Sequence, residues 1–401
     1  MSVVLAAVTV AAAAGCGGSS SGTGNGSDPA YAGDLRGRLQ KLLTEMKVPG
    51  AVVMITSKEK GDWTATFGTR SIGGGAAMGA GDHFRVGSNT KTMTGTVILQ
   101  LVQEGKLALN DPIAKYRQDV PGGDKITIAQ LLDMRSGLYN YSEDPAFNAE
   151  LDKNPGRVWQ PAELVTIGLA KPPYFPPGEG FHYSNTNTVL LGLLAEQLTG
   201  GKLADEFQKR IFGKLGLKGT SLPALDDRKI PDPHPQGYMF GTNIETLEDA
   251  ALPAAQQSAA AAGTLLPSDH TDDNPSWAWA AGGAISTAGD LQRYVKALID
   301  GELLNAELQK TRIDSIRPSD PSNPNSAGYG LGIAKFGPLV GHDGQMPGFN
   351  SFMARDKDKD VTVIVMTSLF AAADGRQPAN VLALEIIQTL YGRPTPAPSG
   401  T

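Results

Sequence analysis

The sequence is poor in cysteine and histidine, which limits the chemistry that the protein can use. One cysteine among 401 residues excludes an intramolecular disulfide and a metal site built from several cysteines. The histidines are scattered, and no two of them have the i, i+4 spacing of a helical zinc-hydrolase motif. A zinc hydrolase is therefore disfavoured, and we expect no metal site. The histidines are His83, His182, His234, His270 and His342.

Basic residues are not in excess either. Lys and Arg total 35 against 41 for Asp and Glu, which gives a net charge of −6. Nucleic-acid binders and membrane-surface proteins rely on basic patches, so this balance argues against both classes. Hydrophobic residues make up 40% and charged residues 19% of the chain, as in an ordinary globular enzyme. The length allows a large core that needs no disulfide or metal.

No hydrophobic run is long enough to span a membrane as a helix. The apolar run at residues 3–14 has the length of a signal-peptide core, and Gly15-Cys16 follows it. This segment resembles a bacterial lipoprotein signal, in which the cysteine becomes the lipidated first residue. We therefore expect residues 1–15 to be a signal peptide, Cys16 to be lipidated, and the Gly/Ser-rich residues 16–29 to be a flexible tether. The protein would be exported, either secreted or held at the outer face of the cytoplasmic membrane.

Strand patterns lie near both ends of the chain. Helical spacing of leucines predicts a helix over 34–46, and β-rich runs predict hairpins at 51–67 and 351–367. We expect a further strand at 329–333 and a final helix at 381–390. Strands at both ends with helices between them indicate one sheet to which both ends contribute.

The middle of the chain contains mostly helical patterns and Pro/Gly-rich loops. Residues 222–275 show no clear period, and we expect a long loop or irregular insertion there. The fold class is thus α/β (α+β), an antiparallel sheet flanked by helices, with an inserted all-helical lobe. The expected divisions are 30–392 for the folded domain, about 30–88 and 300–392 for its α/β part, about 89–299 for its helical part, and 393–401 for a disordered tail.

Ser88 and Lys91 form the first candidate for chemistry. Ser88 follows a glycine at the start of a predicted helix, and Lys91, three residues on, projects from the same face. A serine hydroxyl becomes a good nucleophile when a base takes its proton, and a lysine with a lowered pKa is such a base. The helix N-terminus adds N–H groups for a developing oxyanion. On these two residues alone, a helix cap and a surface charge are the simpler interpretation.

Two later clusters add groups of the right kind. Tyr183 and Asn185 stand just before a helix, where a tyrosine hydroxyl can relay a proton and an asparagine amide can orient a carbonyl. His342 and Gly344 lie between predicted strands, and the glycine lets a substrate approach the strand edge closely. Each cluster alone also fits a packed loop or a hairpin turn.

Ser-x-x-Lys, Tyr-x-Asn and His-x-Gly occur in this order, and the combination is specific. With FRVGSNTK, LLDMRSGLYNY, HYSNTN, SWAWAAGGAIST and YGLGI, the chain resembles the serine penicillin-recognising enzymes over nearly all of 30–392. This family includes DD-carboxypeptidases, class C β-lactamases and related esterases. The match is closest to the secreted actinobacterial D-alanyl-D-alanine carboxypeptidase type. The resemblance implies a β-lactamase/transpeptidase-like fold, a site between its two parts, and no metal or organic cofactor.

The resemblance also implies a role for each motif residue. Ser88 would be acylated, Lys91 would take its proton, and Tyr183 would relay a proton to the leaving group. The N–H groups of Ser88 and Gln345 would form the oxyanion hole, and His342 would stand where other members carry Lys or His. The residues expected to bind substrate are Asn185, Trp277, His342, Gly344 and Gln345.

Two positions depart from the carboxypeptidase pattern. Asp343 stands where that type has threonine, and Ala334 stands where an arginine helps to bind the substrate's terminal carboxylate. Lys335 is next to Ala334, but on a strand it would point to the other face. A carboxylate substrate would meet a like charge, so both changes favour neutral substrates.

We expect a serine hydrolase that works through an acyl-enzyme, of the D-alanyl-D-alanine carboxypeptidase and penicillin-binding type. One alternative is a class C β-lactamase-like esterase or amidase for small neutral substrates. Another is a silent cell-wall-binding protein, although such a protein has no chemical need for all four residues Ser88, Lys91, Tyr183 and Asn185. An α/β-hydrolase would need Gly-x-Ser-x-Gly, which is absent around Ser88. The expected partner is a small-molecule or peptide substrate, and the expected state is a monomer.

Overall fold

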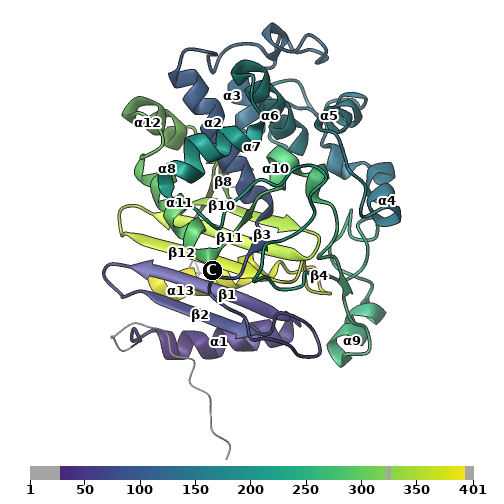
Figure 1. Ribbon diagram of the computed structural model, residues 1–401, viewed down its shortest axis with the longest axis vertical. Coiled ribbons are helices and arrows are strands. Elements are labelled where there is room, and N and C mark those ends of the chain that lie inside the picture. Colours follow the sequence, from purple (N-terminus) through teal and green to yellow (C-terminus); the bar gives the residue numbers. More distant parts are fainter. Residues whose placement is uncertain (1–27, 321, 323–326, 393–401) are drawn as a thin grey trace, which may run out of the picture.

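The computed structural model describes residues 28–320, 322 and 327–392. The expected signal peptide, the lipidated Cys16, most of the tether and the tail at 393–401 lie outside these residues. An eight-stranded sheet with helices on both faces forms the lower part of the molecule in Figure 1, and a group of helices forms the upper part. No helix of the described residues is long and apolar enough to cross a membrane.

The sheet is antiparallel and combines both ends of the chain, as the strand patterns predict. Its order is β2-β1-β12-β11-β10-β9-β8-β7. The pairing of β1 with β12 joins the two ends, with Met54 opposite Ile364. The strands are β1 (Gly50–Ser57), β2 (Trp63–Gly68), β7 (Arg317–Pro318), β8 (Gly328–Tyr329), β9 (Ala334–Phe336), β10 (Leu339–Met346), β11 (Phe349–Asp356) and β12 (Val361–Thr367).

Both faces of the central strands are covered because apolar residues occupy both sides of each strand. Val53 and Val363 face α1 (Ala32–Glu45) and α13 (Pro378–Tyr391), whereas Val52 and Ile364 belong to the larger core on the other face. Helix α11 (Ala288–Asp300) covers that second face with Leu291, Tyr294, Val295 and Leu298. Helix α11 falls, except for its last residue, within the segment 89–299 assigned to the helical part, but its apolar stripe packs on the sheet.

The helical lobe is built around two helices that carry candidate site residues. Helices α2 (Thr90–Gln103) and α6 (Asn185–Thr199) pack against each other and are largely buried. The remaining helices are α3 (Ile128–Leu132), α4 (Pro145–Lys153), α5 (Pro161–Leu169), α7 (Leu203–Phe207), a π-helical turn (Gln208–Phe212), α8 (Gly213–Leu215), α9 (Ala254–Ala262), α10 (Trp279–Gly282) and α12 (Ala306–Asp314). Short pieces include η1 (Gly87–Asn89), η2 (Ile113–Lys115), η3 (Tyr141–Glu143), η5 (Pro275–Trp277) and the strand pairs β3 (Phe84–Arg85) with β6 (Ile285–Ser286) and β4 (Tyr238–Met239) with β5 (Ser268–Asp269).

Two segments differ from the sequence expectations. The expected strand at 329–333 ends at Tyr329, because the following residues turn: the Gly330 N–H donates to the Ile333 carbonyl at 2.9 Å. The segment 222–275 is mostly irregular, as expected, but it contains α9 and the β4–β5 pair. Helix α9 is mostly exposed, so its alanines form no apolar stripe that a periodicity search would detect.

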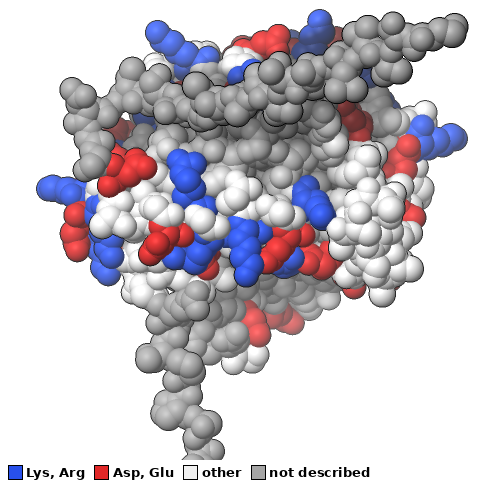
Figure 2. Space-filling model, turned by 90° about the horizontal axis from the view of Figure 1, so that it is seen from below, with Lys and Arg blue, Asp and Glu red and all other residues white. Residues whose placement is uncertain are grey.

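The face beyond α1 carries both signs of charge. Seen from below, acidic and basic side chains lie beside one another there (Figure 2). This mixture agrees with the balanced composition and differs from the one-sided basic surface of a nucleic-acid binder.

Candidate active site

Ser88 lies in the short helical turn η1, directly before α2. Gly87 has a left-handed φ of +52°, and a Cβ at this position would lie 2.6 Å from the Gln345 backbone nitrogen. Only glycine tolerates this combination of backbone angle and close approach. The chain therefore brings Ser88 directly against strand β10.

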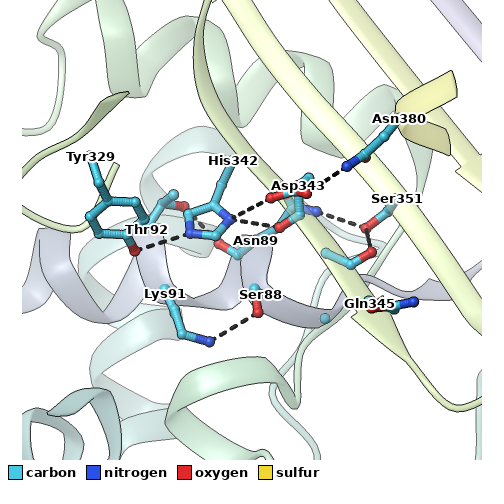
Figure 3. Close-up of polar contacts among 12 residues, drawn as sticks. Ser88, Asn89, Lys91, Thr92, Tyr329, His342, Asp343, Gln345, Ser351 and Asn380 are labelled. Atoms are coloured by element: carbon cyan, nitrogen blue, oxygen red, sulfur yellow. Dashed lines mark hydrogen bonds and ion pairs between the residues drawn. The ribbon is translucent and has the colours of Figure 1, made fainter. Parts of the chain in front are cut away.

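Lys91 is the immediate neighbour of Ser88. Its Nζ lies 2.9 Å from Ser88 Oγ (Figure 3). The same nitrogen lies 2.7 Å from the carbonyl oxygen of Ala281 in α10. The lysine is buried, and this burial lowers its pKa well below the usual value, while the charge of Asp343 offsets part of the shift. A lysine in this state has a free lone pair that can accept the serine proton.

Tyr183 lies on the other side of Lys91. The Lys91 Nζ is 4.7 Å from the centre of the Tyr183 ring. The Tyr183 hydroxyl is buried and has no hydrogen bond of good geometry to the described residues, although Ser88 lies near enough to lower its pKa a little. Burial has the larger effect and raises this pKa well above the usual value. Tyr183 therefore keeps its proton and can donate it.

Asn185 is the first residue of α6 and is held by the η3 loop. Its side-chain amide donates to Ser142 Oγ at 2.9 Å, and its backbone N–H donates to Asn140 Oδ1 at 3.0 Å. These contacts orient the side chain on the helical-lobe side of the site.

His342 is buried between Tyr183 and Tyr329. Its Nδ1 lies 2.6 Å from the Asp343 carbonyl oxygen, and its Nε2 lies 3.0 Å from the Tyr329 hydroxyl (Figure 3). A carbonyl only accepts, so Nδ1 carries a proton; in the neutral ring Nε2 then accepts from Tyr329. Its ring centre is 6.1 Å from that of Tyr183.

Asp343 brings a negative charge to β10. Its Oδ2 accepts from Asn380 Nδ2 of α13 at 2.8 Å, and its Oδ1 lies 3.5 Å from His342 Nδ1. Burial acts to raise the pKa of the Asp343 carboxyl, but hydrogen bonding from His342 and Asn380 outweighs it and holds the pKa below its usual value. The carboxylate is therefore ionised at neutral pH.

Gly344 and Gln345 bring β10 against η1. A Cβ on Gly344 would lie 2.0 Å from the Val86 carbonyl oxygen, so no larger residue fits here. The Gln345 side chain donates to the Phe370 carbonyl at 3.1 Å. The backbone of Gln345, in contrast, lies against Gly87 of η1. The N–H groups of Ser88 and Gln345 thus belong to adjoining segments, as an oxyanion hole requires.

Trp277 lies in an aromatic group of the helical lobe. Its ring centre is 6.2 Å from that of Phe147, and its carbonyl accepts from the Tyr141 hydroxyl at 2.6 Å. The side chain is partly exposed. None of the contacts described here joins Trp277 to Ser88 or Lys91, so its place in the cleft stays a prediction.

Ala334 and Lys335 occupy the region where the carboxypeptidase type has a carboxylate-binding arginine. Ala334 is buried in an apolar group with Tyr329 and Tyr183. Lys335 is exposed and lines a separate cavity of about 590 Å³ with Lys310 and other residues. The side of Tyr183 that faces Ala334 therefore has apolar surroundings.

Several supporting residues escaped the sequence analysis. Asn89 Nδ2 donates to the Val86 carbonyl and to Ser351 Oγ at 2.9 and 2.8 Å, which joins η1 to β11. Asn380 and the Ala281 carbonyl were also missed, because a lone asparagine on a helix and a backbone oxygen leave no signal in a single sequence.

Comparison with known proteins agrees with this geometry. A family model described as Beta-lactamase matches residues 35–388. Penicillin-binding protein 4* of Bacillus subtilis (strain 168) is 26% identical over 326 residues, which are 79% of this chain and 66% of that protein. The chain spans about two thirds or less of the length of the curated relatives it matches.

Two solved structures cover nearly the whole chain. A D-stereospecific amidohydrolase from Streptomyces sp. is 30% identical with a TM-score of 0.75, over 91% of this chain and 99% of that one. The D-amino acid amidase from Ochrobactrum anthropi SV3, complexed with D-phenylalanine, is 25% identical with a TM-score of 0.72, over 90% and 99%. The chain therefore belongs to the Beta-lactamase family of serine hydrolases and has the β-lactamase/transpeptidase-like fold.

Proposed function

We propose that the protein is a serine amidohydrolase that cleaves small amides or esters through an acyl-enzyme. The observation that carries this proposal is the 2.9 Å hydrogen bond between Lys91 Nζ and Ser88 Oγ. Lys91 is buried and its pKa is lowered, so the pair combines a nucleophile with a base in the correct protonation state. A silent binding protein has no need of such a pair.

Acylation proceeds by transfer of the serine proton. Lys91 takes the proton as Ser88 Oγ bonds to the substrate carbonyl carbon, and the N–H groups of Ser88 and Gln345 hold the oxyanion. The bond to the leaving nitrogen or oxygen then breaks. Tyr183 donates its hydroxyl proton to the leaving atom and regains one from protonated Lys91, which restores both groups.

Deacylation repeats these transfers with water as the nucleophile. Water adds to the acyl carbon as its proton passes to the Tyr183–Lys91 pair, and the ester bond to Ser88 breaks. The pair then returns the proton to Ser88 Oγ. The acid and the free enzyme are the products, and neither a metal nor an oxidant takes part.

The substrate class follows from the charge beside the site. Asp343 is ionised and Ala334 is apolar, so a carboxylate next to the scissile bond would meet repulsion without a compensating cation. The solved structures named as a D-stereospecific amidohydrolase and a D-amino acid amidase support an amide of a D-amino acid as substrate.

The test is hydrolysis of D-phenylalaninamide, with L-phenylalaninamide for comparison. We expect Ser88-dependent release of ammonia from the D-amide, together with an acyl adduct on the intact protein when a slow ester is used. The Ser88→Ala variant should show neither. Hydrolysis that persists in Ser88→Ala would place the nucleophile elsewhere.

A second candidate is D-alanyl-D-alanine carboxypeptidase activity, which the likeness to a penicillin-binding protein favours. Its test is the intact mass after incubation with benzylpenicillin, beside D-alanine release from a D-Ala-D-Ala peptide. A Ser88-dependent adduct with peptide cleavage would support it. Intact penicillin and an uncleaved peptide would contradict the carboxypeptidase candidate and leave the amidohydrolase as the remaining proposal.

We also propose export with Cys16 as the lipidated residue, on the basis of residues 1–16. Mass spectrometry of the mature N-terminus tests this proposal. A diacylglycerol-modified Cys16 would support it, and an unprocessed Met1 would contradict it. A monomer likewise stays a prediction, which light scattering would check.

A further inference from the structure

We propose that Asp343 is a specificity residue that selects substrates whose leaving group carries a positive charge near the scissile bond. This inference rests on the proposed amidohydrolase function and adds the charge of the leaving group to it. Four observations carry it: the position of Asp343 on β10, the direction in which the leaving group departs, the charges around the carboxylate, and its exposure.

The first observation is the position of Asp343 on the strand edge. Strand β9 pairs with β10 only over Leu339–Gly341, so among the described residues no strand pairs with this edge of β10 from His342 onward. The η1 turn packs against Gly344 and Gln345. Along a strand, residues two apart are separated by about 7 Å. Asp343 is two residues before Gln345, whose N–H is proposed to bind the substrate oxyanion. A substrate group a few bonds from the carbonyl therefore reaches the carboxylate.

The second observation is the direction of the leaving group. Tyr183, the proposed proton donor to the leaving atom, packs against His342 at 6.1 Å and Tyr329 at 5.9 Å between ring centres. Both partners lie toward the His342 end of the open edge, away from Gln345. The leaving group therefore departs toward His342 and Asp343, whereas the acyl part stays near Gln345.

The third observation is that the charge of Asp343 is only partly matched. Its neighbours are the neutral amide of Asn380 and the His342 ring, and the ion pairs described for this residue include no lysine or arginine. The charge of Asp343 raises the pKa of Lys91, but Lys91 must be neutral to act as the base and so does not compensate that charge. The apolar Ala334 supplies no cation either. A substrate cation would provide the missing charge, and a carboxylate would be repelled.

The fourth observation is exposure. About a third of the Asp343 side chain is accessible (32%), whereas the side chain of its neighbour His342 is 2% exposed. Figure 3 shows the carboxylate between His342 and Asn380, which together fix its position without neutralising it. A fixed and accessible carboxylate loses little entropy when it binds a cation.

The test uses three amides of D-phenylalanine with leaving amines of similar length and different charge. They are the neutral propylamide, the cationic 3-aminopropylamide and the anionic 2-carboxyethylamide. In the wild type we expect kcat/KM for the cationic amide to exceed that of the neutral amide about tenfold, equivalent to roughly 1.4 kcal/mol. The anionic amide should fall below the neutral one by a similar factor. Added salt should reduce both differences.

Asp343→Asn is the informative variant because it keeps an oxygen acceptor for Asn380 and removes the charge. We expect its ratio of cationic to neutral kcat/KM to fall to about one. Asp343→Thr, which has a different shape, should lose the same preference and improve turnover of the anionic amide. The matched control is Asp358→Asn, which removes one charge from an exposed position on the β11–β12 hairpin and should keep the wild-type ratio.

The outcomes separate this inference from the function on which it rests. If the neutral amide is cleaved in a Ser88-dependent manner and Asp343→Asn keeps the wild-type charge ratio, the selectivity proposal is wrong and the amidohydrolase proposal stands. If the wild type cleaves none of the three amides but hydrolyses D-phenylalaninamide, the selectivity proposal is overturned and the amidohydrolase proposal stands. If it hydrolyses neither, both proposals are overturned. Because each ratio is measured within one variant, a loss of folded protein does not change it.

Discussion

The two titratable side chains next to Ser88 respond to the same burial in opposite ways. Burial disfavours the charged form of each group, so it lowers the pKa of Lys91 and raises the pKa of Tyr183. The shifts favour the neutral, basic form of the lysine and the protonated, acidic form of the tyrosine. A pair of groups separated in this way can take a proton from Ser88 and supply one to the leaving atom.

Replacement of Lys91 tests its role as the base. Lys91→Ala should reduce the acylation rate by about 10²–10⁴-fold, the usual contribution of a general base. The rate of Ser88 labelling by a slow ester, followed by intact mass, measures this effect directly. Lys106→Ala is a suitable control, because Lys106 is exposed and forms an ion pair with Glu104, away from Ser88. Near-normal labelling of Lys91→Ala would show that another group takes the proton.

The pH profile of Asp343→Asn provides a second test at this scale. Asp343 raises the pKa of both Lys91 and Tyr183, so removal of its charge should lower both. The proposed mechanism requires neutral Lys91 and protonated Tyr183. The acid and alkaline limbs of kcat/KM for a neutral amide should therefore both move to lower pH. His342 and Tyr329, the other polar groups on this side of the site, are unchanged in this variant. An acid limb that moves upward would contradict this electrostatic assignment.

At the scale of elements, the site depends on the contact between η1 and β10. Gly344 allows this contact, because any Cβ there would lie 2.0 Å from the Val86 carbonyl oxygen. The clash is with backbone, which cannot rotate away as a side chain can. The distance between Ser88 and the Gln345 N–H is therefore set by two backbones in direct contact.

Gly344→Ala should separate these two elements. We expect a loss of about 1–3 kcal/mol in the free energy of unfolding, typical of overpacking, together with a large fall in kcat. Gly37→Ala is the matched control, because its Cβ would meet nothing within 4 Å on the exposed side of α1. That variant should be more stable by about 0.5–1 kcal/mol. Thermal unfolding and amide hydrolysis of both variants measure the difference.

The sequence predicts the helices and long strands well, and it predicts the supporting contacts poorly. The leucine spacing of α1 and the apolar runs of β1 and β12 are local signals, and the structure agrees with them. The turn at Gly330 and the contact of Asn380 with Asp343 depend on tertiary structure. Ser88, Lys91 and Tyr183 were found through the order of three motifs, because no one motif separates a catalytic serine from a helix cap.

The whole molecule is held together by contacts between the two ends of the chain. Helix α13 packs on α1 and on the outer face of β12, where Leu382 and Ile386 are fully buried. The salt bridge of Arg38 with Glu385 and the β1–β12 ladder join the same segments. Loss of packing in α13 should therefore weaken the entire sheet, including the strand that carries His342.

Two alanine substitutions in α13 test this dependence. Ile386→Ala should lower the free energy of unfolding by about 2–5 kcal/mol, because the side chain is 0% exposed and its removal leaves a cavity. Leu384→Ala, on the same helix and 56% exposed, should change stability by less than about 0.5 kcal/mol. For Ile386→Ala, the loss of hydrolysis on heating should coincide with the loss of circular dichroism. Equal stabilities of the two variants would show that α13 is not part of the cooperative unit.

The distance along the chain between Ser88 and the strand that completes its site also affects synthesis. Gly344 follows Ser88 by 256 positions, so a ribosome adding about 5–20 residues per second exposes the serine roughly 13–50 s before β10 exists. During this interval the nascent chain has the nucleophile and its lysine but lacks the Gln345 N–H. Under the proposed mechanism, incomplete chains that stop before β10 should therefore be inert toward amides, and hydrolytic activity should begin only when translation is nearly finished.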